Sequence, residues 1–148
     1  PHLNLCDNVR FAAADQKEAD TLLESFGIAH LRNRRPHQVS GGERQRCAIC
    51  QALARRPEVL LLDEPFSSLD VVNRRSLREK LKTVKQTLAC PTVYVTHDIN
   101  EALYLGDEIV PIVEGKIDRD WMQRTMAWVC PAERPARAVR RQRLALVY

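Results

Sequence analysis

Short apolar runs that alternate with amphipathic stretches constrain the fold of this 148-residue chain more than any other feature. One run covers residues 58–62 and leads into Asp63-Glu64-Pro65, and another covers residues 92–96 and leads into His97. Apolar runs of about four to eight residues are typical of strands buried on both faces of a parallel sheet. Their alternation with helical stretches predicts a three-layer α/β domain built on a parallel sheet.

The amphipathic stretches predict the helices that accompany this sheet. They cover residues 15–26, 40–56, 72–88 and 98–105. Ser40 and Glu43 have the spacing of a capping box, and Pro57 cannot continue the second helix. Residues 109–113 predict one more strand, at an edge of the sheet because Pro111 lacks the N–H that a central strand needs. Residues 1–14 show no clear period.

Charge is divided unevenly at Asp118. Residues 1–118 carry 16 Lys and Arg against 17 Asp and Glu, whereas residues 119–148 carry 7 against 2, so the net charge of +4 comes from the tail. We therefore expect a domain over 1–118 and an arginine-rich tail over 119–148, to which the sequence assigns no fold. Basicity confined to a tail does not favour nucleic acid as a partner.

Composition indicates a globular chain without a membrane span. Apolar runs such as residues 59–62 are far shorter than the roughly 20 residues of a transmembrane helix, and no signal peptide is recognisable at the start. We expect a cytoplasmic protein. Five cysteines at irregular spacing favour reduced thiols. Cys47 and Cys50 could form half of a redox or zinc site, but two buried residues one helical turn apart are the favoured interpretation.

Two groups of residues at strand ends could carry chemistry, because open α/β sheets bind their ligands there. Asp63 could hold a hydrated Mg²⁺ while Glu64 polarises a water, and the alternative is two solvated acids in a turn. His97 could reach a terminal phosphate, although in isolation a core histidine would be the favoured interpretation.

A third group lies at the start of the second predicted helix. Ser40-Gly41-Gly42-Glu43 exposes backbone N–H groups to which a phosphate could bind. Capping alone would explain Ser40 and Glu43, but it does not need two successive glycines, each of which destabilises a helix by about 1 kcal/mol relative to alanine. The glycines therefore favour a binding role. Residues 67–70 read by themselves as a turn into the third helix.

Four motifs follow one another in an order known from one family. They are Val39-Ser-Gly-Gly-Glu-Arg-Gln-Arg46, Leu60-Leu-Leu-Asp-Glu-Pro65, Ser67-Ser-Leu-Asp70 and Thr96-His-Asp98. With them, residues 1 to about 117 closely resemble the ATP-binding subunits of ABC transporters, in which these motifs are the signature loop, the Walker B strand, the D-loop and the H-loop. The resemblance implies a P-loop NTPase-like core that binds and hydrolyses ATP with Mg²⁺.

The resemblance also implies a role for each matching residue. Asp63 would coordinate Mg²⁺, Glu64 would be the general base, and His97 would contact the γ-phosphate. Four residues would close over the nucleotide of a second ATPase subunit in a head-to-tail dimer, namely Ser40, Gly41, Gly42 and Glu43. Asp70 would communicate between the two sites. The family works with transmembrane permease subunits, which implies a peripheral location at the inner face of the cell membrane.

One family motif does not occur in these 148 residues. The phosphate-cradling pattern G-x-x-x-x-G-K-[ST] is absent, since Gly115-Lys116 is followed by Ile117. The resemblance implies that this Walker A loop precedes residue 1 and that the core is N-terminally truncated. We therefore expect weak ATP binding and negligible hydrolysis by this chain alone.

Several functions are compatible with these motifs. Among importers, the chain most resembles those for oxyanions such as molybdate or sulfate, with polyamine and sugar importers next. A soluble ABC-type ATPase of DNA maintenance would use the same motifs, with the basic tail as a phosphate contact. A non-catalytic module whose signature helix docks on an intact ATPase partner is the third possibility.

Overall fold

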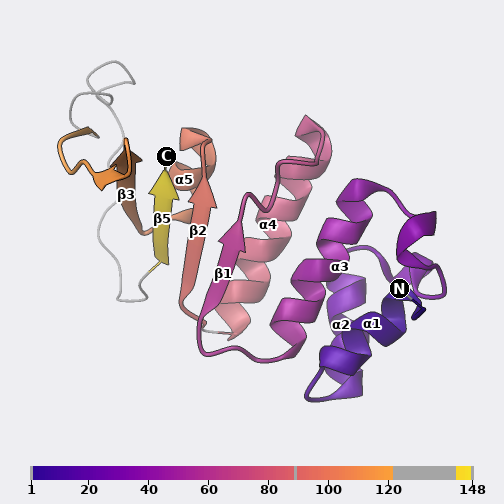
Figure 1. The fold of residues 1–148 in the computed structure, drawn as a ribbon. Helices are drawn as coiled ribbons and strands as arrows, with labels where there is room; N and C mark the ends of the chain where they lie inside the picture. The colour runs from indigo at the N-terminus through magenta and orange to yellow at the C-terminus, as the bar shows by residue number, and fades with distance from the viewer. Residues whose placement is uncertain (1, 89, 122–142, 148) are drawn as a thin grey trace. The chain divides into compact units, whose positions relative to one another are not determined.

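The computed structural model describes residues 2–88, 90–121 and 143–147 (Figure 1). Its backbone divides into two compact units, and we describe each by itself. The helical unit comprises Pro1–Leu60 and Pro65–Cys90, and the sheet unit comprises Leu61–Glu64 and Pro91–Tyr148. None of the described helices is long and apolar enough to cross a membrane.

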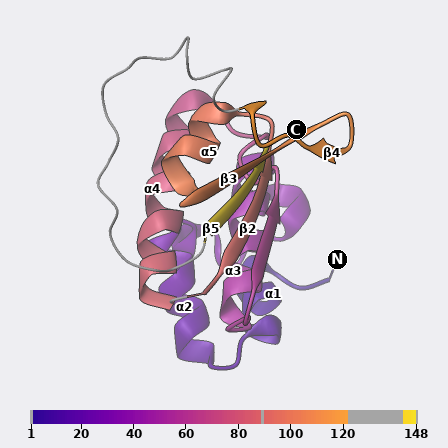
Figure 2. The ribbon, with the colours of Figure 1, turned by 90° about the vertical axis from the view of Figure 1, so that its left-hand side faces the viewer.

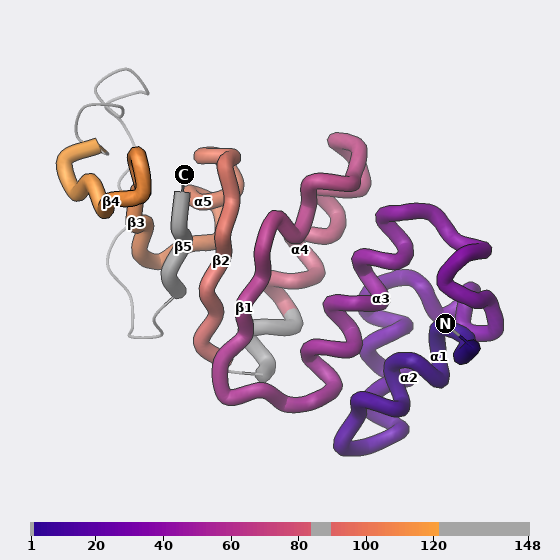
Figure 3. The backbone as a smooth tube through the Cα atoms, in the orientation of Figure 1, coloured from indigo at the N-terminus to yellow at the C-terminus, as the bar shows by residue number. Residues whose placement is uncertain are grey.

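Four α-helices and two 3₁₀ turns make up the helical unit. They are α1 (Leu5–Ala12), α2 (Gln16–Ser25), η1 (Ala29–Leu31), η2 (Pro36–Gln38), α3 (Gly41–Ala54) and α4 (Val71–Leu88). The tube of Figure 3 shows α1, α2 and α3 as neighbours, and each of the three contacts the other two. Apolar side chains from these helices form the core of this unit, and Leu23, Cys50 and Leu53 among them are fully buried.

The predicted helices of this unit are confirmed to within two residues at each end. Asp15 caps α2, and Gly27 follows it with a φ of +70°, a left-handed conformation that glycine adopts without steric cost. The amphipathic pattern of α4 predicts one apolar stripe of Leu77, Leu81, Val84 and Leu88, and it is confirmed at Leu77 and Leu81, both fully buried. The other two stripe residues, Val84 and Leu88, have side chains outside the described set.

α1 has no counterpart among the predicted helices. Asn4 caps it by accepting a hydrogen bond from the Asp7 amide, and the backbone N–H groups of Leu5 and Cys6 donate to the carbonyls of Arg34 and Arg32 at 2.8 and 3.0 Å. The first turn of any helix has backbone N–H groups without partners inside the helix, and here two of them donate to a loop that is distant in the sequence. Eight residues are too few to show a reliable hydrophobic period, which is why the sequence did not predict this helix. Tertiary contacts stabilise it.

The sheet unit contains a five-stranded sheet in the order β1-β2-β5-β3-β4. The strands are β1 (Leu60–Asp63), β2 (Thr92–Thr96), β3 (Glu108–Val113), β4 (Lys116–Ile117) and β5 (Arg143–Val147). β5 pairs in parallel with both β2 and β3, and β4 pairs antiparallel with β3. Helix α5 (Ile99–Leu105) contacts β2 and β5, and Figure 2 shows it along one face of the sheet. The predicted α/β class with a parallel sheet is confirmed.

Two details of the predicted strands are wrong. β1 is buried on one face only: Leu60 and Leu62 are buried, whereas the Leu61 side chain between them is 66% exposed, because its face of the strand remains open to solvent in the described part of the chain. Pro111 does not lie on an edge strand, since β3 runs between β5 and β4. Its carbonyl accepts from the Asp118 amide, so its missing N–H faces the side of the two-residue β4, beyond whose end Asp118 lies.

The arginine-rich tail contributes β5 through residues 143–147, a strand that the sequence did not predict. Residues 122–142 lie outside the described residues, and the boundary at residue 118 stays a prediction. Cys47 and Cys50 are buried on α3 and unbridged, which confirms the interpretation as two buried residues one turn apart. Among the described residues no cluster of three metal-ligating side chains accompanies them.

Candidate functional site

The start of α3 is held by a capping box, as the sequence predicts. The Ser40 hydroxyl accepts from the Glu43 amide at 3.3 Å, while a Glu43 carboxylate oxygen accepts from the Ser40 amide at 2.7 Å and from its hydroxyl at 2.8 Å. These hydrogen bonds stabilise the charged carboxylate and hold the pKa of Glu43 below its usual value. The capping box fixes the direction in which the N–H groups of this first turn point.

The two glycines of the first turn have different surroundings. A Cβ built on Gly42 would collide with the Cδ2 atom of Leu69, a side chain that is itself buried. A Cβ on Gly41 would make only ordinary contacts, the nearest being the Arg44 Nη2 atom at 3.8 Å. Packing therefore explains Gly42, whereas nothing within the helical unit requires a glycine at 41.

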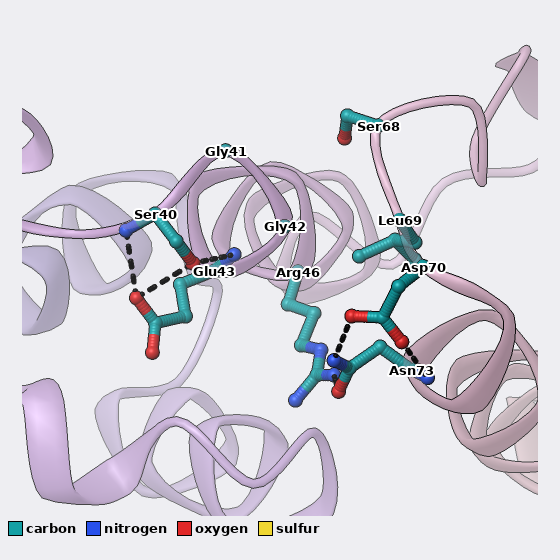
Figure 4. Close-up of a pocket in the computed structure, with 9 residues that line it drawn as sticks. All are labelled: Ser40, Gly41, Gly42, Glu43, Arg46, Ser68, Leu69, Asp70 and Asn73. Atoms are coloured by element: carbon teal, nitrogen blue, oxygen red, sulfur yellow. Dashed lines mark hydrogen bonds between the residues drawn. The ribbon is translucent and has the colours of Figure 1, made fainter.

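A cavity of about 220 Å³ lies between the first two turns of α3 and the segment that leads into α4 (Figure 4). Nine residues line it: Ser40, Gly41, Gly42, Glu43, Arg46, Ser68, Leu69, Asp70 and Asn73. Five of them are predicted site residues, which the structure thus brings together in one unit. Backbone N–H groups at the start of a helix and an arginine side chain are donors suited to an anionic ligand.

Asp70 is fixed by Asn73 on the second wall of this cavity. The Asp70 carboxylate accepts from the Asn73 amide at 2.9 Å and from its side-chain Nδ2 at 2.6 Å. These bonds favour the ionised form and hold the pKa of Asp70 below its usual value. The Asn73 Oδ1 atom accepts from the Arg46 Nη2 atom at 2.7 Å, which links α4 to α3.

The other three predicted residues lie in the sheet unit, at the ends of β1 and β2. The Glu64 backbone N–H donates to the Val95 carbonyl at 2.9 Å, which continues the pairing of the two strands past β1. The Oε1 atom of Glu64 accepts from the backbone N–H of His97 at 2.9 Å and lies 2.6 Å from its Nδ1 atom. Glu64 is 21% exposed and His97 67%, so this pair lies at the surface.

Glu64 also has an unusual backbone. Its φ is +44°, in the left-handed region that residues with a Cβ adopt at a cost of about 1–2 kcal/mol. This conformation turns the chain sharply at the end of β1, where the carboxylate meets His97. Asp63, one residue earlier, is exposed at the end of the strand.

The acidic residues fit a hydrated magnesium ion better than a fully protein-coordinated metal. No group of three His, Cys, Asp or Glu side chains in the described ranges is arranged to hold an ion. Mg²⁺ is commonly bound through one or two carboxylates, with water and phosphate oxygens as its other ligands. The exposed Asp63 carboxylate can supply one such ligand.

Sequence reasoning assigned no site role to the other four residues of the cavity, namely Arg46, Ser68, Leu69 and Asn73. The Asp70-x-x-Asn73 spacing is that of a helix N-cap and its third residue, so a local signal for Asn73 existed. The contacts of Arg46 and Leu69 join segments more than 20 residues apart in the sequence, so no local pattern predicts them.

Comparisons with known proteins agree on one family. The family model described as "ABC transporter" matches residues 1–67. The sulfate/thiosulfate import ATP-binding protein of Shewanella oneidensis is 43% identical over 130 residues, which cover 80% of this chain and 35% of that protein. The spermidine/putrescine import ATP-binding protein of Aliivibrio fischeri is 38% identical over 132 residues, covering 84% and 36%. The chain thus spans about a third of the length of these relatives.

Solved structures show the same fold. A dimeric ATP-binding cassette in a post-hydrolysis state, bound to ADP and Pi, superposes with a TM-score of 0.68 and 30% identity. The match covers 80% of this chain and 56% of that one. The P-loop NTPase-like class expected from the motifs is therefore confirmed at the level of the fold.

Proposed function

Because this chain is homologous to the ATP-binding subunits of ABC importers, we propose that it forms part of an ATPase that powers solute import across a membrane. The observation that carries the proposal is the pairing of Glu64 with His97. Two residues 33 positions apart meet at 2.6 Å where two neighbouring strands end, which is where α/β sheets bind their ligands.

In the proposed reaction, Glu64 accepts a proton from the water that attacks the γ-phosphate of ATP. His97 holds the Glu64 carboxylate through its Nδ1 atom and its backbone N–H, and its ring reaches the γ-phosphate. A magnesium ion on Asp63 would neutralise charge on the phosphates. The strained backbone at Glu64 is consistent with a residue placed for chemistry rather than for folding.

The cavity at the start of α3 would bind the nucleotide held by a second subunit. Ser40, Gly41, Gly42 and Glu43 present the helix start, and the lack of a side chain at Gly41, which lines the cavity, lets a phosphate approach the main chain closely. Asp70 forms the opposite wall and would link the two sites of a head-to-tail dimer. Dimeric cassettes among the similar structures support such a pairing.

The wider assembly follows from the same homology. Relatives whose names describe import of sulfate or of spermidine support a partnership with permease subunits at the inner face of the cell membrane. We propose an oxyanion such as sulfate or molybdate as the first candidate cargo. The phosphate-cradling loop does not occur in these residues, and we propose that it lies in a segment outside them. We therefore expect negligible ATP turnover by the 148 residues alone.

ATP turnover with and without Glu64 tests this function. The 148 residues are assayed alone and mixed with a P-loop-containing partner subunit, and the full-length protein is assayed with its permease. We expect turnover in the full-length assembly and a loss of at least about 100-fold with Glu64→Gln, because a general base contributes about 10²–10⁴ to the rate. Undiminished turnover in that variant would disprove the assigned role, and turnover by the 148 residues alone would disprove the need for an outside loop.

A further inference from the structure

We propose that Asn73 is a positioning residue that fixes the two walls of the cavity in a single geometry. The inference rests on the function proposed for the cavity and adds a residue to it that family membership does not assign. Asn73 lies on the first turn of α4, and its backbone and side chain together contact both walls.

The side-chain amide of Asn73 connects an anion with a cation. Its Nδ2 donates to Asp70 at 2.6 Å, and its Oδ1 accepts from Arg46 at 2.7 Å. A primary amide offers one donor group and one acceptor group, so it satisfies both neighbours at once. Aspartate here would repel Asp70, and leucine would leave both charged groups without this partner.

Arg46 depends on this contact for its orientation. Its Nε atom is buried without a hydrogen-bond partner in the described part of the chain, and the bond from Nη2 to Asn73 aligns the guanidinium with the second wall. Leaving a hydrogen-bond donor without its acceptor costs more free energy when the group is partly buried than when it is exposed to water. Loss of Asn73 should therefore release Arg46 and disturb the α3 wall as well as α4.

Two further contacts join the same walls. The Ser68 hydroxyl donates to the Gln45 side chain, and the Leu69 side chain fills the space that a Cβ at Gly42 would need. With the bond between Arg46 and Asn73, three pairs connect the first two turns of α3 to the segment 68–73. A ligand in the cavity would meet one preformed surface instead of two walls that must first be ordered.

The first test is amide hydrogen exchange, which needs no enzymatic activity. In the full-length protein, Asn73→Leu should raise exchange both in residues 41–46 and in residues 68–73. Arg75→Leu is the matched control: it removes an exposed hydrogen bond to Glu79 on the same helix, and we expect both segments to keep their protection. Faster exchange confined to the start of α4 would show that Asn73 is only a helix cap, and would overturn the proposal.

The second test is a double-mutant cycle in ATP turnover by the full-length assembly. Asn73→Leu and Arg46→Met should each lower kcat about tenfold, with KM for ATP changed less than twofold, because the cavity closes on nucleotide already bound by the partner. The double variant should be no slower than the slower single variant, since both remove one interaction. If the double variant instead lost kcat by the product of the two single losses, Asn73 and Arg46 would act independently and the proposed coupling would be wrong. If the wild-type assembly lacks Glu64-dependent turnover, the proposed function fails, and the exchange test still decides the role of Asn73.

Discussion

At the scale of single residues, the two glycines at the start of α3 show how one sequence motif can combine two physical causes. Gly42 leaves room for the buried Leu69 side chain, whereas a Cβ at Gly41, on the cavity side, would make only ordinary contacts. The sequence alone favoured a binding role for both. The structure restricts that reasoning to Gly41, because packing already accounts for Gly42.

Alanine substitutions should separate these causes. Gly42→Ala should lower the free energy of unfolding by about 1–3 kcal/mol, because the added methyl group overpacks against Leu69. Gly41→Ala should leave it unchanged or raise it by up to about 1 kcal/mol, because alanine is the better helix former. Urea denaturation of both variants measures the difference. Equal destabilisation by the two substitutions would contradict the packing explanation.

The capping carboxylate of Glu43 should make stability depend on pH. Its pKa is lower in the folded protein than in the unfolded chain, so its contribution is fully present above the unfolded pKa of about 4.3 and is lost as pH falls through the folded value. Glu43→Gln keeps an acceptor oxygen but cannot titrate. Between about pH 5 and pH 3, the unfolding free energy of the variant should fall less steeply than that of the wild type.

The comparison of the two proteins isolates this contribution. Other carboxylates with lowered pKa values, such as Asp20 beside Arg10 and Asp70 beside Asn73, titrate in both proteins and cancel in the difference. Parallel pH curves for wild type and variant would show that Glu43 contributes no pH-dependent stability.

At the scale of helices and strands, the sequence predicted those elements whose ends are determined by local residues. The limits of α3 follow from a capping box and Pro57, and α2 ends at a glycine with positive φ. The end of β2 was predicted correctly and that of β1 to within one residue, so the sequence placed Glu64 and His97 at strand ends. Helix α1 and strand β5 were missed because distant partners decide them: backbone carbonyls of the loop at 32–34 for α1, and β2 and β3 for β5.

An exposed helix cap tests the local part of this reasoning. Asp15 caps α2 by accepting from the Lys17 amide at 2.9 Å, and its negative charge lies at the positive end of the helix dipole. Asp15→Ala should lower the free energy of unfolding by about 1 kcal/mol, and Asp15→Asn, which keeps the cap, by much less. Thermal or urea unfolding measures both, and equal losses would assign the effect to charge rather than to capping.

At the scale of the whole molecule, the buried thiols report on the integrity of the helical unit. Cys47 and Cys50 are buried on α3 between α1 and α2, and burial raises the pKa of the Cys47 thiol to about 11 and that of Cys50 further. At pH 8 only about a thousandth of Cys47 would be thiolate, the form that reacts with alkylating agents.

Alkylation should therefore follow unfolding. In native buffer at pH 8, iodoacetamide should leave both thiols unmodified over the time in which a denatured sample is fully labelled, as mass spectrometry of the peptides would show. Labelling should begin at the urea concentration that unfolds the helical unit. Rapid modification in native buffer would mean that the core around α3 opens far below that concentration.

The left-handed backbone at Glu64 means that selection for stability and selection for function favour different residues at this position. Glycine would adopt this φ without the steric cost that glutamate bears, but it would remove the carboxylate that meets His97. If Glu64 has the proposed role, a library of variants screened only for resistance to heat should enrich glycine at position 64, while growth that depends on the proposed transport activity should retain glutamate. Under that proposal, efforts to make this protein more robust by consensus or directed evolution would need to hold residue 64 fixed, because glycine there would raise stability and remove the proposed general base.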